Sequence, residues 1–538
     1  MSTSKLDVEV VQCVRSHPER SPLNVPQIVS LSILDATVLE FDPAAALWIF
    51  DAPADEAGRQ ALSAGQLLSS LRKTLTSYPQ WAGQLRWAPY DPYGNHTERH
   101  GRLRLSYGDD SDPGVEFAIA RCSKPIPDLI PDPEVRSTGM KQWKVENFSS
   151  KELLSSARLT PKNMGKDVPG MMVQVTSFSC GGLAIGIKIV HSLADARSLT
   201  NFVRDWAAIN RAMIMGAHLP SPGPVFDPSL LDRAASGDID ATHPDVTIVE
   251  VARSLPLHRY DFWAPSAGAP AWASSRPSEI DPASIGPLQT PIPWSEWDYT
   301  ARVSHWVVHF TRKELESMRQ AAAKDVPTIT RFSHMDALLA HVWGLITRAR
   351  GLIHDERPVY MDLAFDLRPR LSPPLPDSFL GSPIMMARIS STGAEASAST
   401  LESPGQIASI IRSTMNQFNY SSLPAYLHDA AHEVNSQRIW QGFLGNRHTI
   451  ATSWVGQGMY EMDFGAGRPP RFAEGVMQSC DGLIHLVEAS PLSKRPGSAM
   501  LSSTKHWSDN GVDVSMYLKE DVMERFIKDP SLRRYDFD

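Results

Sequence analysis

The clearest pattern of apolar and polar positions lies between residues 171 and 206. Apolar residues occupy every second position of 183–189, which predicts a strand with one face on a core. Gly181-Gly182 separates this run from the apolar run 171–179, as expected for a hairpin. Four apolar residues then recur at helical spacing, namely Leu199, Phe202, Val203 and Trp206. The chain from His191 to Asp195 should therefore connect a strand to a helix, where side chains can face a cleft.

The second half of the chain shows both kinds of pattern. Ser333 and Asp336 have capping-box spacing ahead of an apolar stripe at helical spacing, which predicts an amphipathic helix. Residues 303–310 and 358–365 have the pattern of strands, and residues 521–529 that of a closing helix. The sum predicts a mixed α/β protein in two lobes.

A segment rich in proline separates the two halves. Residues 216–300 hold 13 of the 42 prolines, together with many glycine, serine and aspartate residues. We expect an N-terminal lobe over residues 1–215, a crossover linker over 216–300 and a C-terminal lobe over 301–538.

Composition narrows the classes of function. The chain has 60 acidic and 52 basic residues and a net charge of −8, so it offers no general attraction for nucleic acid. Its four cysteines form no CxxC pair, and no HExxH motif occurs, so neither a zinc site nor any other metal site is expected. The N-terminus lacks the features of a signal peptide, and no apolar window of eighteen or more residues occurs. A cytoplasmic protein with no membrane span is expected.

The residues His191 and Asp195 form an HxxxD motif, which is weak evidence alone because about one chance match is expected in such a chain. Other stretches occur in the order and approximate spacing of one family. They are LSILD at 31–35, the run from SL at 70–71 through YP at 78–79 to AGQL at 82–85, HSLAD at 191–195, the helix 333–350, DLRPR at 366–370 with PPLP at 373–376, TSW at 452–454 and DFGAG at 463–467. In these stretches the chain resembles the BAHD acyl-CoA-dependent transferases, especially their fungal branch with the trichothecene acetyltransferases.

The sequence departs from the family pattern at three positions. Ala196 replaces the glycine that usually follows the aspartate of HxxxD, and Ala466 replaces the tryptophan of DFGWG. Ser382 stands where the family pattern has an asparagine. None of these changes removes a reacting group.

The resemblance implies a two-lobed fold like that of chloramphenicol acetyltransferase, in which each lobe is a mixed sheet with flanking helices and a long crossover loop joins the lobes. It makes His191 the general base, an imidazole that is largely neutral at cytoplasmic pH. No GxSxG elbow occurs, so direct attack in a ternary complex is expected in place of a serine nucleophile. Asp195 is expected to point away from the substrates and pair with Arg368 or, as the second choice, Arg370.

Further site residues follow from the same resemblance. A hydroxyl or indole N–H of Ser453 and Trp454 could stabilise the oxyanion, with Ser32 as a second candidate near the thioester. The alternatives are an ordinary turn at 452–454 and a helix cap at Ser32. Coenzyme A is anionic, so the start of the helix at Ser333 is the candidate site for it, together with Thr330 and Arg331. Asp463 and Gly465 are expected to form a structural turn.

The predicted function is transfer of an acyl group from acyl-CoA to a hydroxyl or amine of a small molecule of secondary metabolism. Acetyl-CoA is weakly favoured as the co-substrate, no cofactor is expected to be bound permanently, and a monomer is expected. Two alternatives stay open. A free-standing condensation enzyme would carry HHxxxDG, whereas Val190 and Ala196 flank the motif here. A degenerate family member that only binds a metabolite or partner would not need the HxxxD and DxRxR residues. The presence of these residues speaks against this alternative.

Overall fold

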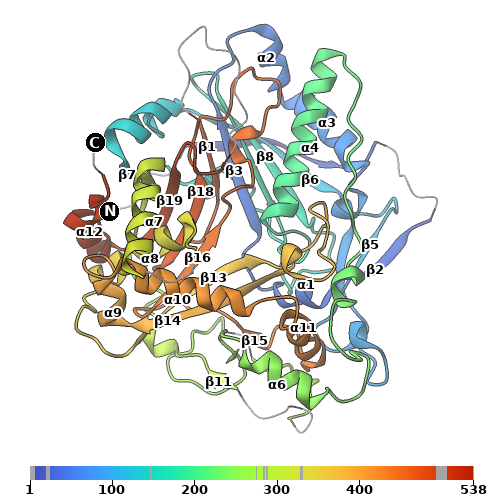
Figure 1. The fold of residues 1–538 in the computed structure, drawn as a ribbon. Helices are drawn as coiled ribbons and strands as arrows, with labels where there is room; N and C mark the ends of the chain where they lie inside the picture. The colour runs from blue at the N-terminus through green and yellow to red at the C-terminus, as the bar shows by residue number, and fades with distance from the viewer. Residues whose placement is uncertain are drawn as a thin grey trace.

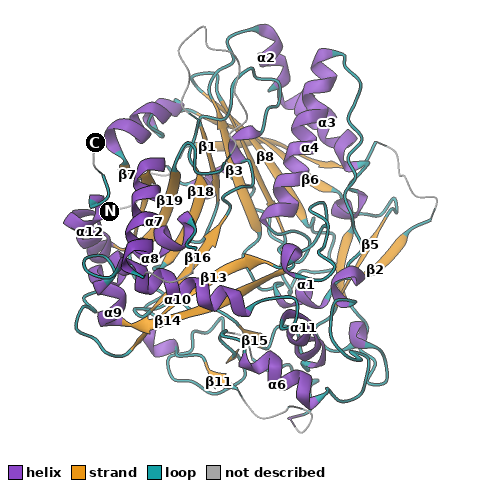
Figure 2. Cartoon of the chain, in the orientation of Figure 1, coloured by secondary structure: helices purple, strands orange, loops and turns teal. Residues whose placement is uncertain are grey.

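Two large mixed β-sheets, each accompanied by helices, form the body of the protein (Figures 1 and 2). This computed structural model describes residues 6–19, 25–145, 148–273, 275–282, 285, 289–326, 331–491 and 506–536. The predicted mixed α/β class is confirmed.

The first sheet has six strands and belongs mainly to the first half of the chain. Its order is β1 (Val8–Ser16), β6 (Val115–Cys122), β8 (Met171–Phe178), β9 (Leu183–Ile189), β3 (Ala44–Phe50) and β17 (Phe472–Gly475). Strands β8 and β9 pair antiparallel from Ser177 opposite Leu183 to Met171 opposite Ile189, so the predicted hairpin is confirmed.

The second sheet has seven strands and belongs mainly to the second half. Its order is β14 (Ile384–Thr392), β13 (Pro358–Asp366), β16 (His448–Ser453), β18 (Leu483–Glu488), β19 (Val512–Lys519), β12 (Val303–Phe310) and β7 (Gln142–Lys144). Strand β7 comes from the first half of the chain and β17 from the second. Each half therefore contributes one strand to the sheet that the other half mainly forms. The strands predicted at 303–310 and 358–365 are confirmed as β12 and β13.

Two small sheets contain the remaining strands of the described residues. One contains β2 (Gln27–Ser30), β5 (Leu103–Tyr107) and β4 (Gln84–Trp87), and the other contains β11 (Thr290–Pro291), β10 (Tyr260–Asp261) and β15 (Ile439–Trp440). The segment 216–300, expected as a linker, supplies β10 and β11 to the second of these sheets and also contains the helices α5 (Ser229–Asp232) and α6 (Val246–Ser254). The boundaries of the two lobes and the linker, at 1–215, 216–300 and 301–538, stay a prediction.

The described residues also form twelve α-helices, some of which contact the two large sheets. They are α1 (Ile33–Thr37), α2 (Glu56–Ala61), α3 (Ala64–Leu75), α4 (Ala196–Met215), α5 (Ser229–Asp232), α6 (Val246–Ser254), α7 (Arg312–Asp325), α8 (His334–Ala349), α9 (Gly393–Ala398), α10 (Pro404–Gln417), α11 (Leu423–His432) and α12 (Glu520–Lys528). Ser333 caps α8 with Asp336 as predicted, and α12 confirms the closing helix within one residue. No helix in the described ranges is both long and apolar enough to cross a membrane.

The apolar face of α4 explains how the junction after β9 is fixed in place. Phe202, Val203 and Trp206 are fully buried in one core with Ile185 and Ile187 of β9. Because this helix is anchored along its length on the sheet, the short connection before it has little freedom. Residues 190–195 therefore hold a defined position at the end of β9, as the sequence predicted.

Candidate active site

His191 lies in the short connection between β9 and α4 and is half-buried. The ring of Phe41 packs against its imidazole edge to face, with centroids 5.5 Å apart. Burial lowers the pKa of His191 below its ordinary value of 6.5, although the nearby carboxylate of Asp195 acts in the opposite direction. The imidazole is therefore predominantly neutral at neutral pH and available as a base.

The hydroxyl of Ser382 determines which ring nitrogen of His191 carries the proton. Nδ1 of His191 lies 3.0 Å from Oγ of Ser382, and that hydroxyl donates its own hydrogen to the backbone carbonyl of His191. Because the hydroxyl hydrogen is already used, Oγ can only accept from Nδ1–H. The lone pair of the ring then lies on Nε2, which is the nitrogen left to accept a proton from a substrate.

Asp195 is buried and faces away from the imidazole, toward Arg368. Nη1 of Arg368 lies 2.6 Å from Oδ2 of Asp195, and Nη2 lies 3.1 Å from Oδ1. Asp195 is also the N-cap of α4 and accepts from the backbone N–H of Ser198 at 2.9 Å. Burial alone would raise the pKa of Asp195, but the adjacent guanidinium lowers it overall, so the pair is ionic.

The two arginines of the DxRxR stretch have different partners. Arg368 has a fully buried side chain and also donates to Asp366, Ser198 and the carbonyl of Phe379. Arg370 instead donates to the backbone carbonyls of residues 415 and 418. The choice that the sequence left open thus falls on Arg368.

A second hydrogen-bonded chain reaches His191 through Asp35 of α1. Ser32 donates to Oδ2 of Asp35 at 2.7 Å, and Oδ1 of Asp35 accepts from the backbone N–H of Ser382 at 2.7 Å. Gly381 has a φ of +134°, and a Cβ there would lie only 2.9 Å from Oδ1 of Asp35. A glycine at 381 therefore allows the close approach that places Ser382 under His191.

The sequence indicated these supporting residues only weakly. Ser32 is completely buried as the N-cap of α1, so the helix-cap alternative agrees with its position, and its hydroxyl is bonded to Asp35. Asp35 belongs to the LSILD stretch, which indicates no role for it, and Ser382 departs from the family pattern. Phe41 carried no signal in the sequence, because its role depends on contacts across the fold.

Ser453 and Trp454 lie at the end of β16. Oγ of Ser453 accepts from the backbone N–H of Val455 at 3.3 Å, while the buried indole of Trp454 packs edge to face on His485 with centroids 5.6 Å apart. In the part of the chain that the structure describes, neither residue makes a hydrogen bond or ring contact with His191. Their predicted role toward the oxyanion stays a prediction.

The residues predicted to bind coenzyme A lie at the start of α8. Thr330 lies outside the described residues, and Arg331 is exposed. The hydroxyl of Ser333 is bonded to Asp336 at 2.8 Å and accepts from Arg412 at 3.0 Å. The exposed guanidinium of Arg331 is thus more accessible to an anionic ligand than the hydroxyl of Ser333.

Asp463 and Gly465 form a turn against the far end of α4. The carboxylate of Asp463 accepts from the N–H of Gly465 at 2.8 Å and pairs with Arg211 at 3.0 Å. Arg211 lies sixteen residues beyond Asp195 on this helix, or about 24 Å along its axis. This turn is therefore remote from His191.

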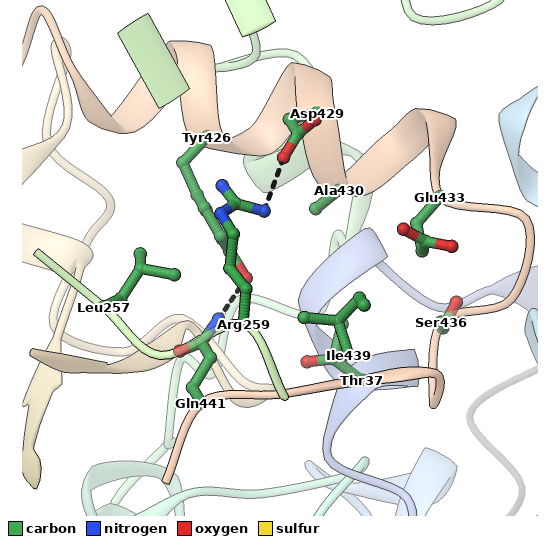
Figure 3. A pocket seen from close by; sticks show the side chains of 10 residues that line it. All are labelled: Thr37, Leu257, Arg259, Tyr426, Asp429, Ala430, Glu433, Ser436, Ile439 and Gln441. Atoms are coloured by element: carbon green, nitrogen blue, oxygen red, sulfur yellow. Dashed lines mark hydrogen bonds and ion pairs between the residues drawn. The ribbon is translucent and has the colours of Figure 1, made fainter. Parts of the chain in front are cut away.

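One cavity lies between the segment 257–259, α11 and β15, and Figure 3 shows the side chains that line it. Arg259 pairs there with Asp429 at 2.8 Å. The cavity volume of about 30 Å³ is far below that of a site for a small-molecule substrate, and His191 does not line it. Phe41 connects this cavity to His191. Its ring packs on both His191 and Trp440, and Trp440 follows Ile439, which lines the cavity.

Comparison with known proteins identifies the family of this chain. A model of the transferase family matches residues 18–250 and 295–532. The chain belongs to this family, the BAHD family. Acyltransferase AFT15-1 of Alternaria alternata is 27% identical over 483 residues, which are 87% of this chain and 87% of that protein. Acyltransferase abl6 of Leptosphaeria maculans is 24% identical over 536 residues, 98% of each chain. The predicted family is thus confirmed, and this BAHD protein is an acyltransferase.

The fold of this BAHD acyltransferase is shared with solved structures. The structure of F. graminearum TRI101 complexed with coenzyme A and deoxynivalenol matches with a TM-score of 0.63 at 16% identity, over 95% of this chain and 99% of that one. The predicted two-lobed fold like that of chloramphenicol acetyltransferase is confirmed.

Proposed function

We propose that this BAHD acyltransferase transfers an acyl group, with acetyl as the first choice, from acyl-CoA to a hydroxyl or amine of a small molecule of secondary metabolism. The observation that carries the proposal is the contact between Nδ1 of His191 and Oγ of Ser382 at 3.0 Å, which leaves Nε2 as a free base. A half-buried neutral imidazole at the end of a strand, oriented by a fixed partner, suits proton removal from an alcohol or amine.

The reaction then needs one base and no covalent enzyme intermediate. Nε2 of His191 takes the proton of the acceptor while its oxygen or nitrogen attacks the thioester carbon. The tetrahedral intermediate collapses by breaking the carbon–sulfur bond, and the protonated His191 returns the proton to the departing thiolate of coenzyme A. Every proton that leaves the acceptor is thus carried by a single imidazole.

In this proposal Asp195 and Arg368 are positioning residues. Their ion pair links the start of α4 to the chain that follows β13, and the N–H of Asp195 donates to the carbonyl of Gly381 at 3.1 Å. Since Gly381 precedes Ser382, the pair helps to hold the hydroxyl that orients His191. Ser32 acts on the same hydroxyl from the other side, through Asp35.

Stabilisation of the oxyanion and binding of acyl-CoA are assigned to residues of the second half of the chain. The hydroxyl of Ser453 or the indole of Trp454 would donate to the developing oxyanion. Arg331, with Thr330 and Ser333 beside it, would supply local attraction for the phosphates of coenzyme A in a protein of net charge −8. Because one chain supplies all of these groups, we propose that the protein acts as a monomer. We also propose that it acts in the cytoplasm.

The experiment is a screen of alcohols and amines with the purified chain and acetyl-CoA, which follows free thiol release and product mass. The expected result is thiol release that depends on the acceptor, with a product heavier by one acyl group. Release at the same rate without any acceptor, for every acyl-CoA tried, would contradict the proposal.

A further inference from the structure

Two histidines and one aspartate converge in the interior, apart from the site described above. Ligand atoms of His258, Asp362 and His448 all lie within 4.8 Å of one another, and the three residues are buried. Nε2 of His258 lies 3.3 Å from Oδ1 of Asp362. That separation equals the distance of about 3.3 Å between two ligand atoms of a tetrahedral zinc ion with bonds of about 2.0–2.1 Å.

The polar atoms of this cluster lack other partners. Among the residues that the structure describes, Nε2 of His258, Oδ1 of Asp362 and Nδ1 of His448 are buried without a hydrogen bond. The second oxygen of Asp362 accepts from the backbone N–H of Phe443 at 3.1 Å, which fixes the orientation of the carboxylate. Unsatisfied polar atoms on all three residues of one buried cluster are unusual in a folded protein and call for an additional binding partner.

The three residues come from segments that the fold brings together. Asp362 lies on β13, and His448 opens β16 opposite Tyr360 of β13. His258 precedes β10 in the proline-rich segment. Figure 3 shows its two neighbours, Leu257 and Arg259, at the cavity described above. The cluster therefore joins the segment 216–300 to the second large sheet.

Aromatic rings enclose the cluster and exclude solvent. The ring of His258 stacks on Tyr260 with centroids 4.5 Å apart, and that of His448 stacks on Tyr360 at 4.8 Å. Phe443 packs edge to face on His448 at 5.1 Å. Rings of this kind hold the two imidazoles in fixed orientations, as ligands of a metal ion require.

Three arginines surround the cluster, and they bear on the charge that it can hold. Arg388 lies opposite Asp362 on β14 and is partly exposed. Arg350 and Arg447 lie near His448, but their charges are offset by Asp481 and Asp355. Asp362 is the acidic residue among the three, and its deprotonated carboxylate would offset part of the charge of an added cation.

We infer that His258, Asp362 and His448 bind one divalent transition-metal ion, with Zn²⁺ as the preferred ion. Two imidazoles and one carboxylate form a nitrogen and oxygen ligand set of the kind that zinc sites use, and a water molecule would complete the coordination. The ion clamps the segment 216–300 to β13 and β16. The metal site is independent of the proposed acyl transfer, because none of the three ligand residues contacts His191.

The test uses the untagged full chain, stripped of metal with a chelator and then equilibrated with Zn²⁺. After gel filtration, mass spectrometry of the metal should find one zinc per chain, and the melting temperature should exceed that of the stripped protein. Co²⁺ in place of Zn²⁺ should give the visible absorption of a cobalt site with nitrogen and oxygen ligands. A stripped wild-type chain that retains no zinc and melts at the same temperature with and without it would overturn the inference.

Variants locate the ion. His258→Ala and His448→Ala should each lose the bound equivalent and the thermal shift, whereas His218→Ala, at an exposed position, and His341→Ala, at a buried position in α8, should keep both. Zinc retained at one equivalent in folded His258→Ala and His448→Ala would also overturn the assignment. If a ligand variant does not fold, the stoichiometry and melting temperature of the wild-type chain still decide the question.

Discussion

Arg368 binds both carboxylate oxygens of Asp195 across 173 positions of sequence, with a side chain that has no exposed surface. The pair joins the start of α4, in the first half of the chain, to the turn after β13 in the second. It therefore ties the histidine side of the site to the half that carries Ser382.

Removal of one member of this pair should destabilise the fold before it affects chemistry. Asp195→Ala leaves the guanidinium of Arg368 buried with Asp366 as its remaining carboxylate, and we expect a loss of about 3 kcal/mol in the free energy of unfolding. Arg368→Met combined with Asp195→Ala should recover much of that loss, because the buried guanidinium is gone and Asp366 keeps its ion pair with Arg197 at 3.2 Å. A double-mutant cycle by denaturant unfolding measures the coupling.

The same helix offers a matched control for this cycle. The pair of Arg211 and Asp463 is largely exposed, so Asp463→Ala should cost at most about 1 kcal/mol. If Asp195→Ala unfolds like the parent yet is inactive, the carboxylate acts directly on the imidazole and its positioning role is wrong.

The pH dependence of kcat/KM should show an acid limb below pH 6.5. Burial lowers the pKa of His191 from its ordinary value of 6.5, and the base works only when unprotonated. Activity should therefore be at its plateau above pH 6.5 and fall as the pH drops through the pKa of the folded protein. The profile is measured at saturating acyl-CoA.

Asp35 provides the control for that profile. Burial raises the pKa of Asp35 to about 7, so its titration could be confused with that of His191. Asp35→Asn keeps an oxygen that can accept from the N–H of Ser382, and the acid limb should stay in place. An acid limb near pH 7 that disappears in Asp35→Asn would assign the titration to the carboxylate.

Ser382→Ala should reduce kcat about 3- to 10-fold, the effect of losing one hydrogen bond that orients the imidazole. KM for the acceptor should change little, because the contact that is lost is one with His191. Ser382→Asn restores an acceptor of the kind that the family pattern has at this position and should recover activity. Equal loss in both variants would show that the effect is one of packing.

No acyl group should remain on the protein after it is mixed with acyl-CoA. His191 and its supporting residues can activate an acceptor, and the chain has no GxSxG elbow to present a serine nucleophile. Intact mass after mixing with the donor alone should equal the mass of the untreated chain. A mass increase of one acyl group that disappears when acceptor is added would indicate a covalent intermediate.

Local patterns allowed part of this site to be predicted from the sequence. Alternation in 183–189 and helical spacing after it placed His191 and Asp195 at a strand-to-helix junction, because both signals depend on neighbours in sequence. The capping box at Ser333 was predictable for the same reason.

The remaining features depend on contacts between distant segments. Ser382 lies 191 positions from His191, and the metal ligands His258, Asp362 and His448 follow no common spacing motif. Likewise, the exchange of β7 and β17 between the two sheets leaves no local pattern. Family resemblance narrowed the partner of Asp195 to two arginines, and the geometry of the folded chain chose Arg368.

The most direct test of the account is turnover of the purified His191→Ala variant, followed as acceptor-dependent thiol release beside the wild-type chain. The exposed histidine variant His218→Ala provides the matched control and should keep full activity. The account predicts a loss of about 10²–10⁴-fold in kcat for His191→Ala, with an unchanged unfolding transition. Near-normal turnover in a folded His191→Ala protein would contradict it.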